Sequence, residues 1–305
     1  MVTVHFGGYQ PPRSVHSRAL RDLQSIVARR SGGEVVVVLR ENVVAQGRRA
    51  AELLTMVARG DLDGCYFASS YLAARVPALN VLDLPFQIGS RSAMFAALDG
   101  AAGEMLGARI ADATAYRVLG FWDNGIRHIS NGVLPIHAPR DCAGLRLRTL
   151  DNALHQAAFA RLGFRPEVID VADLADAVAQ RRVDAQENPL TNLVNFGLHA
   201  HHRFVSLTGH LQGVALVLVN RAWFDGLPLE VRALLAEAMR ECETMQRAAA
   251  EAEDAACLGL LADAGIVPIA AEAIDLPAFR GAMADVVAGA TATLDPVLRR
   301  ALLAH

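Results

Sequence analysis

The clearest alternation of apolar and polar positions lies between residues 144 and 189. It begins at 144–148, where two leucines alternate with two arginines, and this period of two predicts a strand with one apolar face. Helix, strand, helix and strand patterns then follow in turn at 154–162, 168–171, 174–182 and 183–189. Such an order is typical of a parallel α/β sheet.

The first hundred residues and the segment near residue 267 show the same kinds of pattern. Strands are predicted at 2–8, 34–39, 63–70 and 265–269, and helices at 15–30, 48–59 and 92–111. Helix and strand patterns therefore alternate over most of the chain, and the sequence predicts an α/β fold.

Three longer segments predict a division into two lobes. The β-rich runs 116–130 and 204–220 are each interrupted near their centres by glycines, so we expect the chain to cross there between two lobes. A helical pattern covers 229–264 with no proline and no glycine before Gly259. At 1.5 Å per residue this helix is about 50 Å long, which is enough to span both lobes.

Composition narrows the class of partner. The 305 residues are 53% hydrophobic, enough for one large core or two ordinary ones, and the formal net charge is −3. This charge gives no reason to expect a nucleic acid or an anionic membrane as partner. No run approaches the ~20 apolar residues of a membrane-spanning helix, and residues 2–8 resemble a strand rather than a signal peptide. We expect either an internal protein or a mature chain whose signal peptide has been removed.

Several kinds of chemistry are excluded or disfavoured. All 29 basic residues are arginine, so a Schiff-base lysine, a pyridoxal-phosphate anchor and a Walker A lysine are excluded. The sequence contains no G-x-S-x-G, H-E-x-x-H or post-strand G-x-G-x-x-G motif. The four cysteines have no C-x-x-C spacing, so they predict neither a zinc site nor a disulfide framework.

Arg127, Arg148 and Asn188 are the leading candidates for binding. Arg148 and Asn188 fall at the carboxyl ends of predicted parallel strands, where ligands bind in such sheets, and Arg127 follows the break at 123–125. A guanidinium group binds both oxygens of a carboxylate, and an amide adds a donor. Glu187 is a candidate catalytic carboxylate, although a glutamate at a strand end more often orients its neighbours.

A histidine cluster at 199–202 does not predict a metal site. Its three histidines have no acidic or cysteine partner at ligand spacing, so a solvated loop is the preferred interpretation.

The chain resembles the solute-binding proteins of tripartite ATP-independent periplasmic (TRAP) transporters, the DctP-like family. Seven segments carry the resemblance, in order and spacing, over essentially the whole chain: 31–35, 59–63, 82–86, 122–127, 144–148, 183–189 and 220–228. The resemblance implies a two-lobed α/β fold of the periplasmic-binding-protein type, with a hinge of crossing strands and a long helix across both lobes. We expect lobe I to comprise 1–124 and 210–250, and lobe II to comprise 125–209 and 251–305.

The same resemblance implies a function. Such a protein captures a small organic acid in the periplasm and delivers it to the TRAP membrane permease, without catalysis, cofactor or metal, and as a monomer. The residue matching Arg148 binds the ligand carboxylate, and those matching Arg127 and Asn188 add donors. The remaining positions expected to line the pocket are Tyr9, Ser69, Tyr71, Trp122 and His210.

Two departures from the family pattern leave the ligand open. Ala175 stands where a tyrosine is usual, and Val171 where the residue is often aromatic. A dicarboxylate, a keto acid, a sugar acid and an aromatic acid all remain candidates, with a slight preference for a monocarboxylate that has an apolar or aromatic body. The alternatives to a transport function are a two-lobed α/β enzyme that uses Glu187 and a histidine such as His210, and a sensor domain on the same fold.

Overall fold

A single mixed sheet runs through the molecule. The computed structural model describes residues 1–303, and its eight strands lie in the order β2-β1-β3-β8-β4-β7-β5-β6. Their bounds are β1 Val2–Gly7, β2 Val35–Arg40, β3 Gly64–Ala68, β4 Tyr116–Asn131, β5 Arg146–Thr149, β6 Arg165–Val168, β7 Ala185–Pro189 and β8 Phe204–Asn220. The three-strand groups at the two ends of this order are each parallel, which confirms the α/β prediction.

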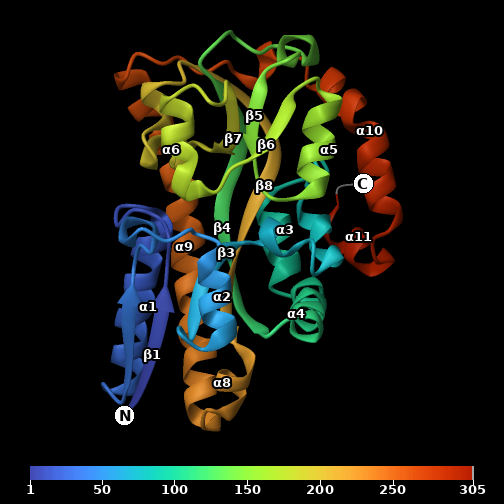
Figure 1. Cartoon of the computed structure of the whole chain (residues 1–305). Coiled ribbons are helices and arrows are strands. Elements are labelled where there is room, and N and C mark those ends of the chain that lie inside the picture. The colour runs from blue at the N-terminus through green and yellow to red at the C-terminus, as the bar shows by residue number, and fades with distance from the viewer. Residues whose placement is uncertain (304–305) are drawn as a thin grey trace.

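Helices pack beside the sheet both around β1–β3 and around β5–β7 (Figure 1). The α-helices are α1 Val15–Ser31, α2 Glu52–Arg59, α3 Arg91–Leu98, α4 Ala101–Ala113, α5 Ala153–Arg161, α6 Val171–Ala179, α7 Leu190–Asn195, α8 Arg221–Gly226, α9 Leu229–Asp263, α10 Leu276–Ala292 and α11 Pro296–Leu302. Short 3-10 helices include η2 Ser69–Leu72 and η3 Pro77–Leu82. In Figure 1, α5 and α6 accompany β5–β7 in the upper part, and α1 and α2 accompany β1 and β3 below.

The two long strands β4 and β8 join these parts. They pair antiparallel from Tyr116 opposite Asn220 to Asn131 opposite Phe204, with three shifts of register on the way. Two of the shifts fall close to the predicted interruptions, where Gly125 has a φ of +85° and Gly209 a φ of +53°. Both values lie in the left-handed region that favours glycine. The breaks in the hydrophobic pattern are thus irregularities inside continuous strands.

Helix α9 follows the length of the molecule, as predicted. Its 35 residues pack against α1, β4 and α7, so it contacts both the part of the molecule around β1–β3 and the part around β5–β7. Gln246 in its middle anchors it to β4, because its amide accepts from the Asp123 N–H at 2.8 Å and donates to the Asp123 carbonyl at 2.7 Å. Figure 1 shows α9 running alongside the central strands.

Buried apolar side chains form three clusters rather than one. The largest lies around β1–β3 and includes Trp122 and Tyr66. A second surrounds Phe159 of α5, and a third joins α6 and α7 to the end of α9. The C-terminal residues Leu294, Leu298 and Leu302 belong to the first cluster, since α11 packs against α3 and α4. The first cluster lies around β1–β3, and the second and third lie around β5–β7. This separation is consistent with two packing units.

Some predicted elements differ from the observed ones. The strand predicted at 168–171 lies three residues earlier, because the side chain of Asp170 accepts the Ala172 N–H and starts α6. The helix predicted at 92–111 is two helices that break at Asp99 and Gly100. The helix predicted from residue 48 begins at Glu52. The strand predicted at 265–269 is a single bridge between Ile269 and Ser206.

Candidate functional site

Five of the eight predicted site residues lie around one small cavity. They are Tyr9, Tyr71, Arg127, Arg148 and Asn188, and the cavity measures about 20 Å³, room for about one water molecule. Strand β7 brings the polar members together, because it pairs with β4 on one side and with β5 on the other. Tyr9 reaches the cavity from the loop after β1, and Tyr71 from η2. The cavity therefore lies between the part of the molecule around β1–β3 and the part around β5–β7.

Arg148 is buried without a carboxylate partner. Only 1% of the residue is exposed. Its Nε donates to the Ile169 carbonyl at 2.9 Å and its Nη2 donates to the Tyr71 hydroxyl at 3.4 Å. Among residues 1–303 no acidic side chain forms an ion pair with this guanidinium. An arginine charge that is removed from water normally has such a partner, so the cavity is chemically suited to an anion.

Arg127, by contrast, is neutralised within the protein. Its Nε donates to Glu187 Oε2 at 2.6 Å and its Nη2 to Glu187 Oε1 at 2.9 Å, and both residues are buried. Burial by itself raises the pKa of Glu187. The charge of Arg127 and hydrogen bonds from His210 and Arg127 outweigh burial and hold this pKa well below its usual range. Glu187 thus serves as the counter-ion of Arg127, and the pair also fixes the direction of the guanidinium.

His210 lies behind this pair rather than in the cavity. Its Nε2 is 3.4 Å from Glu187 Oε2, and its Nδ1 is 2.7 Å from the Thr208 hydroxyl. Burial lowers the pKa of His210, so the ring is neutral at pH 7. It faces a separate hollow beside Phe86 and Gly209. In this geometry His210 positions Glu187 and does not line the cavity around Arg148.

Asn188 reaches the cavity, but its amide is already engaged. Its Nδ2 donates to Gln186 Oε1 at 2.5 Å. Its Oδ1 accepts from Arg127 Nη2 at 3.4 Å and from Asn192 Nδ2 at 3.2 Å. Asn192 Oδ1 accepts in turn from Gln10 Nε2 at 3.3 Å. The role of Asn188 in this arrangement is to orient Arg127 as part of a chain of amides.

The predicted aromatic residues divide into two groups. Tyr9 and Tyr71 flank Phe67 on one side of the cavity, with ring centroids 5.1 and 4.9 Å from that of Phe67. Trp122 is fully buried in the large apolar cluster, where it packs on Tyr66 with centroids 5.7 Å apart. Ser69 is also buried and does not line the cavity. The structure therefore brings neither Trp122, Ser69 nor His210 to the cavity.

Sequence reasoning missed several lining residues. They are Ala50, Phe67, Ala68, Asn124, Leu150 and Asn192, and Val171 also lines the cavity. Asn124 belongs to the interruption of β4, which the pattern indicated only as a crossing between lobes. Asn192 lies in α7, and only its nearness to Asn188 in the sequence could have indicated it. Polar amides line more of the cavity than the sequence predicted.

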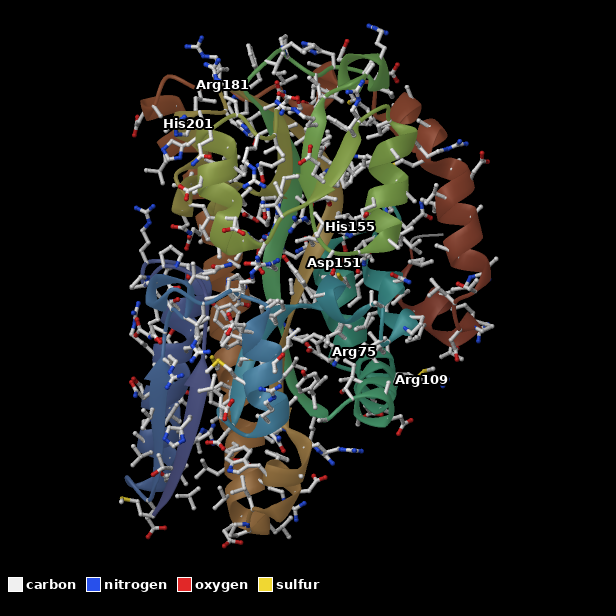
Figure 2. All side chains as sticks on the ribbon, in the orientation of Figure 1. Arg75, Arg109, Asp151, His155, Arg181 and His201 are labelled. Atoms are coloured by element: carbon white, nitrogen blue, oxygen red, sulfur yellow. The ribbon has the colours of Figure 1, made fainter. Side chains whose placement is uncertain are left out.

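A second buried polar cluster lies beside the cavity. It joins the part of the molecule around β1–β3 to the part around β5–β7. Asp83, after η3, accepts from the Ser70 hydroxyl at 2.6 Å and from Asn152 Nδ2 at 3.2 Å, and its Oδ1 lies 2.9 Å from His155 Nε2. Asn152 and His155 belong to the start of α5. Figure 2 shows His155 at the level where the two parts of the molecule meet. These contacts connect the η2–η3 segment to α5.

The other candidate chemistry is dispersed. His201 lies near one end of the molecule, far from His155 (Figure 2). Among residues 1–303 no group of three or more His, Cys, Asp or Glu side chains is placed to hold a metal ion. The four cysteines are buried as free thiols. No described helix is both long and apolar enough to span a membrane.

Known proteins share both the sequence pattern and the fold. Residues 6–293 match the model of the family described as bacterial extracellular solute-binding protein, family 7 (DctP). A solute-binding protein of Verminephrobacter eiseniae is 31% identical over 260 residues, 85% of this chain and 76% of that protein. The 2,3-diketo-L-gulonate-binding periplasmic protein of Escherichia coli K12 is 28% identical over 269 residues, 88% of this chain and 80% of that protein.

Solved structures extend the comparison to the whole fold. A TRAP periplasmic solute-binding protein from Roseobacter denitrificans, with bound β-D-glucuronate, has a TM-score of 0.89 and 27% identity, and covers 98% of this chain and 97% of its own. Another from Bordetella bronchiseptica, with its ligand density assigned to pantoate, has a TM-score of 0.91 and 25% identity, with 98% of both chains covered. The likeness confirms the two-lobed architecture. Because the family model spans nearly all of the sequence, the chain belongs to the DctP family, family 7 of the bacterial extracellular solute-binding proteins.

Proposed function

We propose that this protein is the periplasmic binding component of a TRAP transporter, and that it captures a small organic acid in the cavity between its lobes. The observation that carries the proposal is the buried guanidinium of Arg148, which has no carboxylate partner within residues 1–303. A ligand carboxylate supplies the missing charge and accepts two parallel hydrogen bonds. Arg127 is held in place by Glu187 and adds hydrogen-bond donors.

Capture requires the lobes to move. The cavity of about 20 Å³ is smaller than an organic acid, so the ligand enters an open form and the lobes close around it. We propose that lobe I comprises 1–124 and 210–250 and that lobe II comprises 125–209 and 251–305, of which 304 and 305 lie outside the described residues. Helix α11 is the exception to these bounds, because it packs against α3 and α4, and we assign it to lobe I.

The relatives support an acid as the ligand. The proteins compared above are named for, or hold, 2,3-diketo-L-gulonate, β-D-glucuronate and pantoate, and each of these molecules contains a carboxylate. Delivery to a TRAP permease, work as a monomer and a periplasmic location follow from membership of the family as part of the same proposal. A nucleic acid, a cofactor and a metal have no part in it.

A thermal-shift screen against organic acids tests this function. The purified protein is melted with C4-dicarboxylates, keto acids, sugar acids and aromatic acids, since a ligand that binds only the folded state raises the melting temperature. We expect at least one class of carboxylate to raise it by several degrees. If no carboxylate does so while a neutral compound does, the proposal is wrong.

The enzyme and sensor alternatives are separated by the fate of the ligand. We expect an acid that stabilises the protein to be recovered chemically unchanged after prolonged incubation. Conversion of that acid would favour the two-lobed enzyme. Capture by a receptor domain, with no effect of the protein on uptake through a TRAP permease, would favour the sensor.

A further inference from the structure

Three asparagine side chains line the cavity, and they differ in the hydrogen bonds that they can still make to a ligand. Asn188 and Asn192 use both ends of their amides in hydrogen bonds to protein groups. Asn124 is 5% exposed, and its Oδ1 is buried without a hydrogen-bond partner. Its side chain makes no hydrogen bond to any described residue. Among these amides, only that of Asn124 retains its full capacity for hydrogen bonding.

The backbone around Asn124 is fixed by its neighbours on both sides. The carboxylate of Asp123 accepts from the Gly125 N–H at 2.7 Å and from Gln212 Nε2 at 2.8 Å, and Gln246 of α9 pairs with both backbone groups of Asp123. Gly125 follows in the left-handed region. Asn124 is therefore held on a rigid part of β4, as a side chain that recognises a ligand needs to be.

An unpartnered amide in a cavity with two arginines sets a chemical requirement on the ligand. The arginines supply donors alone, which suit a carboxylate. The Asn124 amide ends in a carbonyl and an NH₂ group, and a hydroxyl satisfies either of them because it both donates and accepts. A second carboxylate accepts only, and a hydrocarbon does neither, so the Oδ1 acceptor would stay unpaired with both.

We infer that the ligand is a hydroxy acid, and that Asn124 is the residue that selects it by hydrogen bonding to a hydroxyl group near the carboxylate. This inference rests on the proposed function and makes it more specific. It also reverses the slight preference for an apolar or aromatic acid that the sequence alone gave. A site that is built to hydrogen-bond a hydroxyl discriminates strongly against an analogue that lacks it.

Isothermal titration with pairs of acids matched in ring size or, for open chains, in carbon number tests the inference. One pair is D-glucuronate and cyclohexanecarboxylate, another is D-erythronate and butanoate, and succinate represents the dicarboxylates. Any further acid that stabilises the protein is paired with its deoxy counterpart. We expect the wild-type protein to bind the hydroxylated member of a pair at least about tenfold more tightly, and Asn124→Leu to remove most of that ratio.

Two further variants make the result specific. Asn192→Ala removes an amide that is already engaged, so we expect it to weaken both members of a pair alike and to leave their ratio unchanged. Asn124→Ala repeats the test if Asn124→Leu does not fold, as judged by its thermal melt.

The outcomes separate this inference from the proposed function. A wild-type ratio near one, a preference for a deoxy acid or succinate, or an unchanged ratio in a folded Asn124 variant would overturn the hydroxy-acid inference while acid binding stood. Binding of no acid at all would overturn the proposed function as well.

Discussion

Two arginines at the cavity, twenty-one positions apart, have opposite electrostatic situations. Arg127 makes a two-point ion pair with Glu187, and both are buried. Arg148 has a backbone carbonyl and a tyrosine hydroxyl as its hydrogen-bond partners. One guanidinium is a permanent part of the structure, whereas the charge of the other is incompletely compensated until an anion arrives. This difference predicts a contribution of Arg127 to stability, and it is the reason that we propose Arg148 as the residue that binds the ligand.

Glu187→Gln tests the structural role of the Arg127 pair. The amide keeps the shape of the side chain but leaves Arg127 buried without a counter-charge, so we expect the free energy of unfolding to fall by about 3–5 kcal/mol. Urea denaturation measures it. Asp184→Asn is the matched control, because Asp184 pairs with a partly exposed Arg146. Its cost should be below about 1 kcal/mol. Equal losses in the two variants would contradict the structural role.

At the scale of elements, the site depends on irregularities inside long strands. β4 carries Asn124, Gly125 and Arg127 within four residues, and its register against β8 shifts between Asp123 and Gly125 and again after Arg127. A regular strand would direct these side chains alternately to opposite faces. The irregular backbone instead places both Asn124 and Arg127 at the same cavity.

Gly125→Ala tests how tightly this irregularity is packed. A Cβ at residue 125 would lie 2.8 Å from Pro189 Cβ, whereas one at Gly144, with a similar φ of +78°, would have no neighbour within 4 Å. The left-handed backbone costs about 1–2 kcal/mol with either alanine. We expect Gly144→Ala to cost that amount in urea denaturation and Gly125→Ala to cost clearly more. Equal costs would mean that β7 moves away easily.

The sequence predicted elements better than it predicted contacts. The long helix, the parallel strands and the two interrupted strands follow from local hydrophobic periods, which are fixed by the chain itself. Trp122 was expected at the pocket and lies in the core, and Asn124 was expected only in a crossing between lobes and lines the pocket. The direction of these two side chains is set by register shifts between β4 and β8, which depend on residues almost ninety positions away. Periodicity carries no information about such shifts.

At the scale of the whole molecule, the structure buries several histidines in neutral form. Burial lowers the pKa of His16 to about 3 and that of His202 to about 4. The unfolded chain binds a proton at these residues near pH 6.5. Between about pH 6.5 and 4, the unfolded chain therefore binds more protons at these histidines than the folded protein does. Linkage then requires that each such histidine contributes a loss of stability as the pH falls through this range, while the carboxyls of Glu243 and Asp123, whose pKa burial raises to about 7 and about 6, contribute in the opposite direction.

The free energy of unfolding should therefore depend measurably on pH. For each such histidine, the free energy of unfolding should fall by up to about 1.4 kcal/mol per pH unit below pH 6.5. Urea denaturation at pH 7.5, 6.0 and 5.0 measures this slope. His202→Gln should reduce it, while His201→Gln, at an exposed neighbour, should not. Equal slopes in the His202→Gln and His201→Gln variants would show that the His202 ring is not buried as described.

Titration of wild type, Arg148→Met and Arg146→Met with D-glucuronate, pantoate and succinate measures whether Arg148 binds a carboxylate. Methionine keeps the length of the side chain and removes the charge. Arg146 lies two residues away on the same strand and pairs with Asp184. We expect Arg148→Met to fold at least as stably as wild type without ligand, because a buried unpaired charge is gone. It should bind the acid at least about 30-fold more weakly, while Arg146→Met binds it normally. A folded Arg148→Met protein with wild-type affinity for the acid would show that Arg148 does not bind the ligand carboxylate.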